Sequence, residues 1–261
     1  MPDHHYKAIP KSRIATFDVY EVGKTKHHIS ALLECDVTDS RLKLKQKKSE
    51  GKKWSFNAWL LKVIGNTIQN YPEVAAYMAS KKKLIIFDDI NITMVVEKEL
   101  NGEKVPIPLT IDQVNTKSVE AITMEIEVAK KQNFSTEDIV LHQKSNKGER
   151  FYYLLPKFLR LFIWKYVLGH PKVAYRKMGN VVVTSVGMMG RINGWFIHSS
   201  VHPISFGIGS IMKKPWVVDD EICIREILNM TILLDHDVID GAPMARFVQE
   251  LVKNIEKGVE L

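Results

Sequence analysis

Residues 235–242 read Asp235-His236-Asp237-Val238-Ile239-Asp240-Gly241-Ala242 and form a polar stretch between two regularly patterned segments of this 261-residue chain. Residues 227–234 before it have the composition of a buried strand. Pro243 after it suits a first helical turn, and Gly258 stands where a helix should stop. The apolar positions between them recur at helical spacing, at Met244, Phe247, Val248, Leu251, Val252 and Ile255. We therefore expect His236 and Asp240 to lie in a strand-to-helix turn.

A second informative stretch is residues 179–190, GNVVVTSVGMMG. Its β-branched run at residues 181–184 predicts a buried strand, and Gly187 predicts a tight turn after it. Another strand is predicted around residues 204–211. Nearer the start of the chain, residues 28–37 predict a strand, and residues 56–71 have the apolar spacing of a buried helix that Pro72 stops.

The middle of the chain mixes both kinds of element. Residues 84–87 and 92–97 predict strands, and Asn101-Gly102 predicts a turn. Pro106 and Pro108 place the extended piece around them at a sheet edge or outside the ladder. Residues 118–131 predict a helix and residues 145–149 a polar loop. Without an internal repeat or a long linker, the pattern predicts one mixed domain over residues 1–261.

The HxxxDG pattern of His236, Asp240 and Gly241 resembles the signature shared by chloramphenicol acetyltransferases and by the catalytic domain of the E2 components of 2-oxoacid dehydrogenases. Asp235 before the histidine and Ala242 after the glycine match the E2 version. Residues 179–190 resemble the E2 strand that supplies an oxyanion-stabilising hydroxyl, and residues 30–38 and 56–72 resemble the first strand and a helix of that family. The resemblance covers the chain from about residue 9 to the end. It implies an α+β fold, a two-layer α/β sandwich with a mixed β-sheet and flanking helices, in a freestanding acyltransferase domain without a lipoyl or a peripheral subunit-binding domain.

The resemblance also implies roles for individual residues. Acyl transfer between thiols needs a base, because a free thiol with a pKa of about 8.5 is mostly protonated at neutral pH. His236 is the expected general base. Thr184 is the expected oxyanion donor, with Ser185 as the alternative, since successive strand residues face opposite sides. Asp240 is expected to anchor the turn through an ion pair with Arg13.

Charge and composition bound the partners. A net charge of +7 with dispersed lysines and no nucleic-acid motif favours coenzyme A over nucleic acid as the anionic ligand, and most of the remaining charge is expected to be a solvated face. Two cysteines and an N-terminus without an apolar run predict a cytoplasmic protein without a signal peptide, and no spacing indicates a metal. The resemblance implies a homotrimer or a multiple of trimers, with a lipoyl-bearing protein as partner in trans. His27 and His28 are expected to be structural.

Residues 151–168 are the most apolar stretch of the chain. They contain Lys157, Arg160 and Lys165, and they are too short and too charged to span a membrane. We expect a helix in the core or at an oligomer interface in preference to one docked on a membrane.

Three functions remain open at this stage. The first is a CoA-dependent acyltransferase acting on a thiol such as dihydrolipoamide. The second is a catalytically idle trimeric scaffold of the E2 type, and the intact HxxxDG pattern argues against it. The third is a small-molecule O-acetyltransferase of the chloramphenicol type. Asp237 stands where E2 domains commonly have arginine, and it leaves the identity of the acceptor open.

Overall fold

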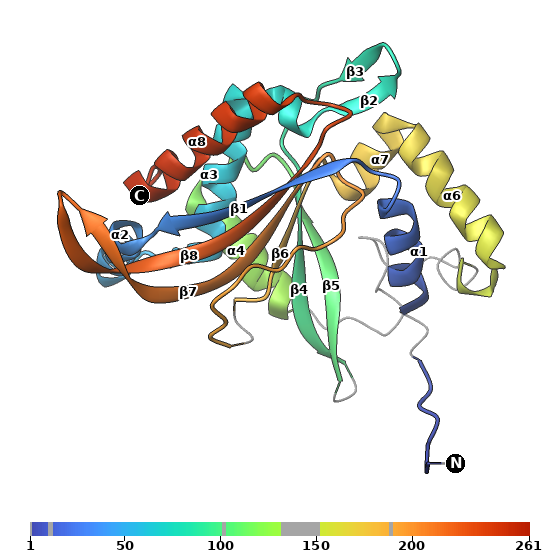
Figure 1. Ribbon diagram of the computed structural model, residues 1–261, viewed down its shortest axis with the longest axis horizontal. Helices are drawn as coiled ribbons and strands as arrows, with labels where there is room; N and C mark the ends of the chain where they lie inside the picture. The colour runs from blue at the N-terminus through green and yellow to red at the C-terminus, as the bar shows by residue number, and fades with distance from the viewer. Residues whose placement is uncertain (1, 10–12, 101–102, 132–151, 188–189) are drawn as a thin grey trace.

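The computed structural model describes residues 2–9, 13–100, 103–131, 152–187 and 190–261 (Figure 1). The predicted turn at Asn101-Gly102 and the predicted loop at residues 145–149 lie outside these ranges. The helices are α1 (Arg13–Gly23), α2 (Thr38–Ser49), α3 (Phe56–Asn70), the 3-10 helix η1 (Pro72–Ala75), α4 (Val119–Lys131), α6 (Lys157–Gly169), α7 (Pro171–Met178) and α8 (Gly241–Lys257). The strands are β1 (His28–Asp36), β2 (Tyr77–Ser80), β3 (Lys83–Ile85), β4 (Ile92–Leu100), β5 (Glu103–Ile111), β6 (Val181–Ser185), β7 (Ile204–Val218) and β8 (Glu221–Asp235).

Six strands form one mixed sheet in the order β1-β8-β7-β6-β4-β5. β6 runs parallel to both β4 and β7, and the other neighbours are antiparallel. β5 lies at the edge of the sheet, as Pro106 and Pro108 predict, because a proline has no N–H to donate to a second neighbour. β2 and β3 form a separate two-stranded sheet.

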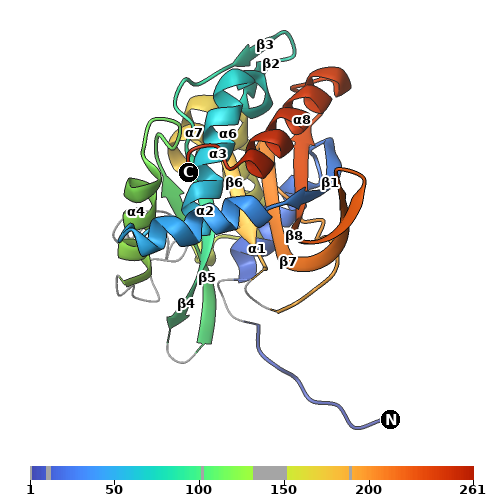
Figure 2. The ribbon, with the colours of Figure 1, turned by 90° about the vertical axis from the view of Figure 1, so that its left-hand side faces the viewer.

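One face of the large sheet is covered by α2, α3, α4 and α8 (Figures 1 and 2). The core lies between these two layers and includes Trp59 of α3 and Phe206 of β7. α8 buries the apolar stripe that its sequence predicts, and Gly258 ends it in the left-handed conformation, with a φ of 63°. The predicted two-layer mixed fold is therefore confirmed.

β7 and β8 form a hairpin of two 15-residue strands, longer than the sequence predicts. Their inner halves are buried and were recognisable as apolar runs. Their outer halves alternate exposed and half-buried side chains, and Ile222 and Ile224 near the tip are 79% and 76% exposed. Backbone hydrogen bonds between β7 and β8 hold the outer halves together. These bonds do not depend on buried side chains, so the outer halves have no apolar run in the sequence.

α1, α6 and α7 lie together at one side of the molecule (Figure 1). α6 has no buried residue. The described part of residues 151–168 therefore does not pack in the core, and the other expected position, an oligomer interface, stays a prediction. No described helix is both long enough and apolar enough to cross a membrane.

Candidate active site

The histidine turn, residues 235–240, joins the end of β8 to α8. Its backbone is held on both sides. The Asp235 N–H donates to the carbonyl oxygen of Pro203 at 2.9 Å, and the His236 N–H donates to the carbonyl oxygen of His27 at 3.0 Å. The side chain of His236 is exposed. The structure thus confirms the strand-to-helix turn and leaves the imidazole of His236 accessible.

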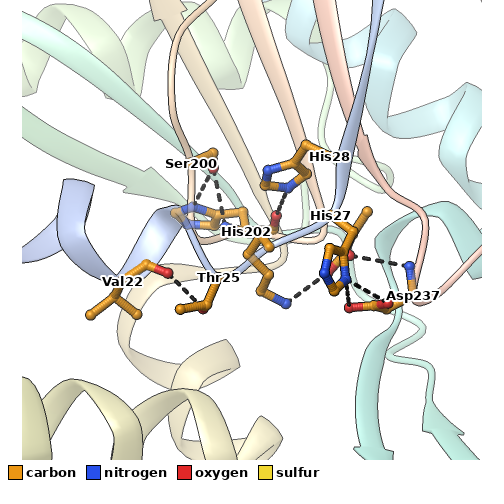
Figure 3. Close-up of polar contacts among 9 residues, drawn as sticks. Val22, Thr25, His27, His28, Ser200, His202 and Asp237 are labelled. Atoms are coloured by element: carbon orange, nitrogen blue, oxygen red, sulfur yellow. Dashed lines mark hydrogen bonds and ion pairs between the residues drawn. The ribbon is translucent and has the colours of Figure 1, made fainter.

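Two side-chain pairs fix this turn to the start of β1 (Figure 3). Lys26 Nζ lies 2.7 Å from Asp235 Oδ2, and the Asp235 side chain is 1% exposed. His27 Nδ1 donates to the carboxylate of Asp237, 2.9 Å away, at the surface. The residues that pair are more than 200 positions apart, so no spacing in the sequence could reveal them. Register brings them together, because His28 pairs with Asp235 across the β1–β8 ladder.

Two neutral histidines lie near the turn (Figure 3). His28 Nε2 donates to the carbonyl oxygen of His202 at 2.9 Å, and His202 Nε2 donates to the carbonyl oxygen of Met178 at 2.9 Å. Burial lowers the pKa of His202 to about 4 and also lowers the pKa of His28. Both rings therefore act as uncharged donors to backbone. This is the structural role expected for His28.

Asp240 and Arg13 are not brought together within the chain. Asp240 immediately precedes α8, where its carboxylate is exposed and has no hydrogen bond or ion pair among the described residues. Arg13 starts α1 and its guanidinium lies 5.5 Å from the ring centroid of Phe17. A carboxylate at a helix N-terminus is still favoured by the helix dipole. The ion pair itself has no support from this arrangement.

Thr184 and Ser185 lie on opposite faces of β6. Val181 and Val183 point into the core, so Ser185 continues that face and Thr184 points to the other. Thr184 pairs with Gly207 across the sheet. The ring of His198 lies against Gly207, with Nδ1 2.9 Å from where a Cβ on Gly207 would lie.

His198 was not recognisable from the sequence, since residues 190–203 show no regular pattern. Its Nε2 makes a short hydrogen bond to Ser205 Oγ, and burial lowers its pKa. Thr231, next to Gly207 on β8, has a buried hydroxyl without a hydrogen-bond partner among the described residues. Polar groups from β6, from β8 and from residues 190–203 before β7 thus gather on the face to which Thr184 points.

His236 and Thr184 of one chain are far apart. Thr184 is level with Gly207 and Thr231 across the sheet. Four residues of β8 at about 3.3 Å each, and two strand spacings of about 4.8 Å, separate Thr184 from Asp235, so their backbones are about 16 Å apart. A histidine and a threonine side chain cannot bridge that distance. One chain alone does not combine these two groups in one site.

Two cavities lie on either side of residues 54–56. The strand cavity, about 530 Å³, reaches Ser185 and Gly187 and carries the cations Arg41, Arg191 and Lys213. Arg41 is paired there with Glu226 at 2.7 Å. The lysine cavity, about 890 Å³, is the larger of the two.

The lysine cavity is lined mainly by cations. Its basic residues are Lys48, Lys52, Lys53, Lys130 and Lys131, against the single acid Glu127. Trp54 also lines it, and its indole N–H is buried without a hydrogen-bond partner among the described residues. The sequence predicts that most of the positive charge lies on a solvated face. Part of that charge is instead concentrated around the lysine cavity. Among the described residues, no His, Cys, Asp and Glu side chains form a group that could hold a metal.

Comparison with known proteins agrees with the fold. The model of the family "2-oxoacid dehydrogenases acyltransferase (catalytic domain)" matches residues 17–140 and 174–261. A dihydrolipoyllysine-residue acetyltransferase component of the pyruvate dehydrogenase complex from Rickettsia typhi is 25% identical over 262 residues, which cover 97% of this chain and 55% of that protein. A probable dihydrolipoamide acetyltransferase from Listeria monocytogenes superposes with a TM-score of 0.68 at 20% identity, covering 98% of this chain and 95% of that one. A chloramphenicol acetyltransferase superposes with a TM-score of 0.50 at 10% identity, covering 97% and 96%.

The fold and the histidine turn define a chloramphenicol-acetyltransferase-like domain. The chain belongs to the family of 2-oxoacid dehydrogenase acyltransferase catalytic domains. It spans about half the length of the curated relatives that it matches. The family match leaves out residues 141–173, which include α6.

Proposed function

We propose that this chain is a CoA-dependent acyltransferase that moves an acyl group between CoA and a thiol acceptor such as dihydrolipoamide. The observation that carries the proposal is the HxxxDG turn between β8 and α8, with an exposed His236, in a member of this family. His236 is the general base. It accepts the proton of the attacking thiol and returns it to the departing thiolate.

The thiolate attacks the thioester carbonyl carbon, and the carbonyl oxygen takes up the negative charge. A positioned hydroxyl stabilises that oxyanion, with Thr184 as the donor and Ser185 as the alternative. Collapse of the tetrahedral intermediate expels the first thiol as thiolate. The thiol does not come from the buried Cys35, since burial raises its pKa to about 12.

The separation of the two groups supports a site built between copies of the chain. If His236 and Thr184 act on one carbonyl, they come from different subunits, because they lie about 16 Å apart within one. A homotrimer, or a multiple of trimers, satisfies this requirement, with each subunit giving a base to one neighbour and a hydroxyl to the other.

CoA is assigned to the two cavities beside residues 54–56. The phosphate groups of CoA match the lysine cavity, where Trp54 also offers an unused indole N–H. The pantetheine arm, which binds largely by shape and apolar contact, then leads past Phe56 into the strand cavity, which reaches the end of β6 where the two candidate donors lie. The lysine and arginine side chains of both cavities attract the CoA phosphates electrostatically, and dissolved salt screens this attraction. The affinity for CoA should therefore fall as the salt concentration rises.

The acceptor is proposed to be a lipoyl group carried in trans on another cytoplasmic protein. Asp237 bears on this choice because it adjoins the base. Its carboxylate is engaged by His27, 2.9 Å away. A ligand approaching His236 therefore meets a paired carboxylate instead of a free one, which removes one objection to an E2-type acceptor.

The proposal is tested by thioester turnover of a panel of acyl-CoAs with dihydrolipoamide, with His236→Ala as the control. We expect acyl transfer to dihydrolipoamide that the substitution removes. Transfer to hydroxyl compounds alone would identify the small-molecule O-acetyltransferase. CoA binding without turnover of any thioester would identify the idle scaffold.

A further inference from the structure

α6 turns its apolar face away from the rest of the protein. Phe158 and Phe162 are 69% and 68% exposed, and Tyr166 is 52% exposed. Leu159 and Ile163 on the same side of the helix are also exposed. A surface helix normally turns this face toward the core. A contiguous exposed patch of large apolar side chains marks a surface that contacts a protein, a membrane or a ligand.

Polar contacts hold the helix in this orientation. Arg160 points inward, and its Nε lies 2.6 Å from Oδ2 of Asp18, whose side chain is 1% exposed. The Tyr152 hydroxyl donates to the same carboxylate at 2.7 Å, and Trp164 Nε1 donates to Tyr152 at 3.1 Å. Rotating α6 to bury its aromatic face would carry Arg160 away and leave the buried Asp18 carboxylate without its cation, which is strongly unfavourable. The outward face is therefore built into the fold.

The charge around this face has one sign. Residues 152–178, which span α6 and α7, contain six lysines and arginines and no aspartate or glutamate. Arg160 is neutralised by Asp18, and Lys157 lies 3.8 Å from Glu21. The other four have no ion pair among the described residues and are exposed: Lys165, Lys172, Arg176 and Lys177. Lys165 follows Phe162 by three positions, so it flanks the apolar face.

We propose that α6 docks this protein on an anionic lipid surface, with Phe158, Phe162 and Tyr166 in the interface. An apolar helix face flanked by lysines and free of acids is the chemistry of helices that lie in the membrane plane. α6 has 13 residues, too few to span a bilayer, and it lies at the side of the molecule with α1 and α7 (Figure 1). This inference does not depend on the proposed acyl transfer.

A second copy of the chain fits this face less well. In a two-fold contact between two α6 faces, the unpaired lysines of one copy would meet those of the other, which is unfavourable. A contact of α6 with a different surface of a second copy is one of the outcomes that the test distinguishes.

The test is co-sedimentation of the full chain with vesicles of phosphatidylcholine, alone or with about 30% phosphatidylglycerol. We expect binding to the anionic vesicles only. Phe158→Gln with Phe162→Gln should weaken it by at least about 10-fold, because two aromatic side chains leave the interface. The matched control is Met124→Gln with Val128→Gln, two exposed apolar residues at the same spacing on α4, which should bind as the parent does.

A second pair of variants guards against misfolding of the aromatic variant. Lys165→Gln and Lys172→Gln each leave the apolar face intact and should weaken vesicle binding by about fivefold. Absence of vesicle binding by the parent chain, or equal binding to neutral vesicles, would overturn the proposal. Sedimentation velocity without lipid tests the alternative occupant. If the parent chain forms an oligomer that the aromatic variant does not form, and the parent does not bind vesicles, then a second copy covers α6 and the proposal is overturned.

Discussion

The histidine turn and the end of β6 carry complementary halves of the proposed chemistry, and their surroundings differ. Backbone hydrogen bonds and the Lys26–Asp235 pair hold the turn, and His236 projects from it into solvent. The end of β6 borders the strand cavity through Ser185 and a polar face through Thr184, and the histidine on that face, His198, is partly buried with its Nε2 hydrogen-bonded to Ser205. His236 is therefore held on a fixed turn and lines neither cavity, and the hydroxyls at the end of β6 lie away from it within one chain. The proposed site between two copies of the chain accounts for this separation.

Loss of the base should have the largest effect. His236→Ala should lower kcat by about 1000-fold with CoA binding nearly unchanged, because only the transition state needs the proton transfer. Steady-state kinetics and calorimetry measure the two quantities. Full turnover by this variant would exclude His236 as the base.

Co-expression of two inactive variants tests whether the base and the oxyanion donor come from different subunits. Co-expressed His236→Ala and Thr184→Ala chains that assemble at random should regain about one quarter of the parent activity per site, because one site in four receives both intact groups from different subunits. No recovery would mean that each chain holds its own complete site.

Thr184→Ala should lower kcat by about 100-fold to 1000-fold with little change in KM, as expected when one oxyanion donor is lost. Ser185→Ala should do much less. The two residues lie on opposite faces of β6, so only one can reach the carbonyl. The reverse result would assign the donor to Ser185 and to the face of the strand cavity.

The substitution Lys26→Met tests whether the Lys26–Asp235 ion pair holds the histidine turn. This change leaves the Asp235 carboxylate buried without its cation and should lower the free energy of unfolding by about 3 kcal/mol. The control is Lys24→Met, since Lys24 is largely exposed and lies 4.0 Å from Glu21. Urea unfolding compares the two variants, and equal stability would show that the pair does not hold the turn.

Protonation of the buried histidines should destabilise the same region. The pKa of His202 is lowered to about 4, below the usual 6.5, so the unfolded chain binds this proton more readily than the folded one. The free energy of unfolding should therefore be greatest above pH 6.5 and fall by up to about 1.4 kcal/mol per pH unit between pH 6.5 and 4. His28 and His198, whose pKa values are also lowered by burial, add to the loss as pH falls.

His202→Gln keeps a donor for the carbonyl of Met178 and should reduce the slope of stability against pH. The exposed His170→Gln serves as its control and should leave the slope as it was. An unchanged slope in His202→Gln would contradict a neutral buried His202.

The lysine cavity should give the smallest effect. Lys52→Gln with Lys53→Gln should raise the Kd for CoA by about 10-fold at low salt, with less difference at high salt. Lys81→Gln with Lys82→Gln changes an exposed pair elsewhere and should leave the Kd unchanged. Calorimetry without a difference between the two variants would place the CoA phosphates outside this cavity.

Patterns within short stretches of sequence determined much of this protein. The apolar spacing of α3 and α8, the β-branched run of β6 and the prolines of β5 each predict their element, because a helix or strand repeats its buried positions every few residues. The strand and helix patterns on either side of residues 235–240 placed His236 and Asp240 in the turn for the same reason. These signals depend only on neighbours along the chain.

Tertiary structure alone decided the rest. The Lys26–Asp235 pair, His198 over Gly207 and the lysine cavity each join segments that are separated in sequence, and no local period records them. α6 shows the limit most clearly: its apolar sequence predicts burial, but the inward pair of Arg160 with Asp18 sets the opposite orientation. Hydrophobic periodicity tells which side chains share a face, and only the partners across the fold determine where that face points.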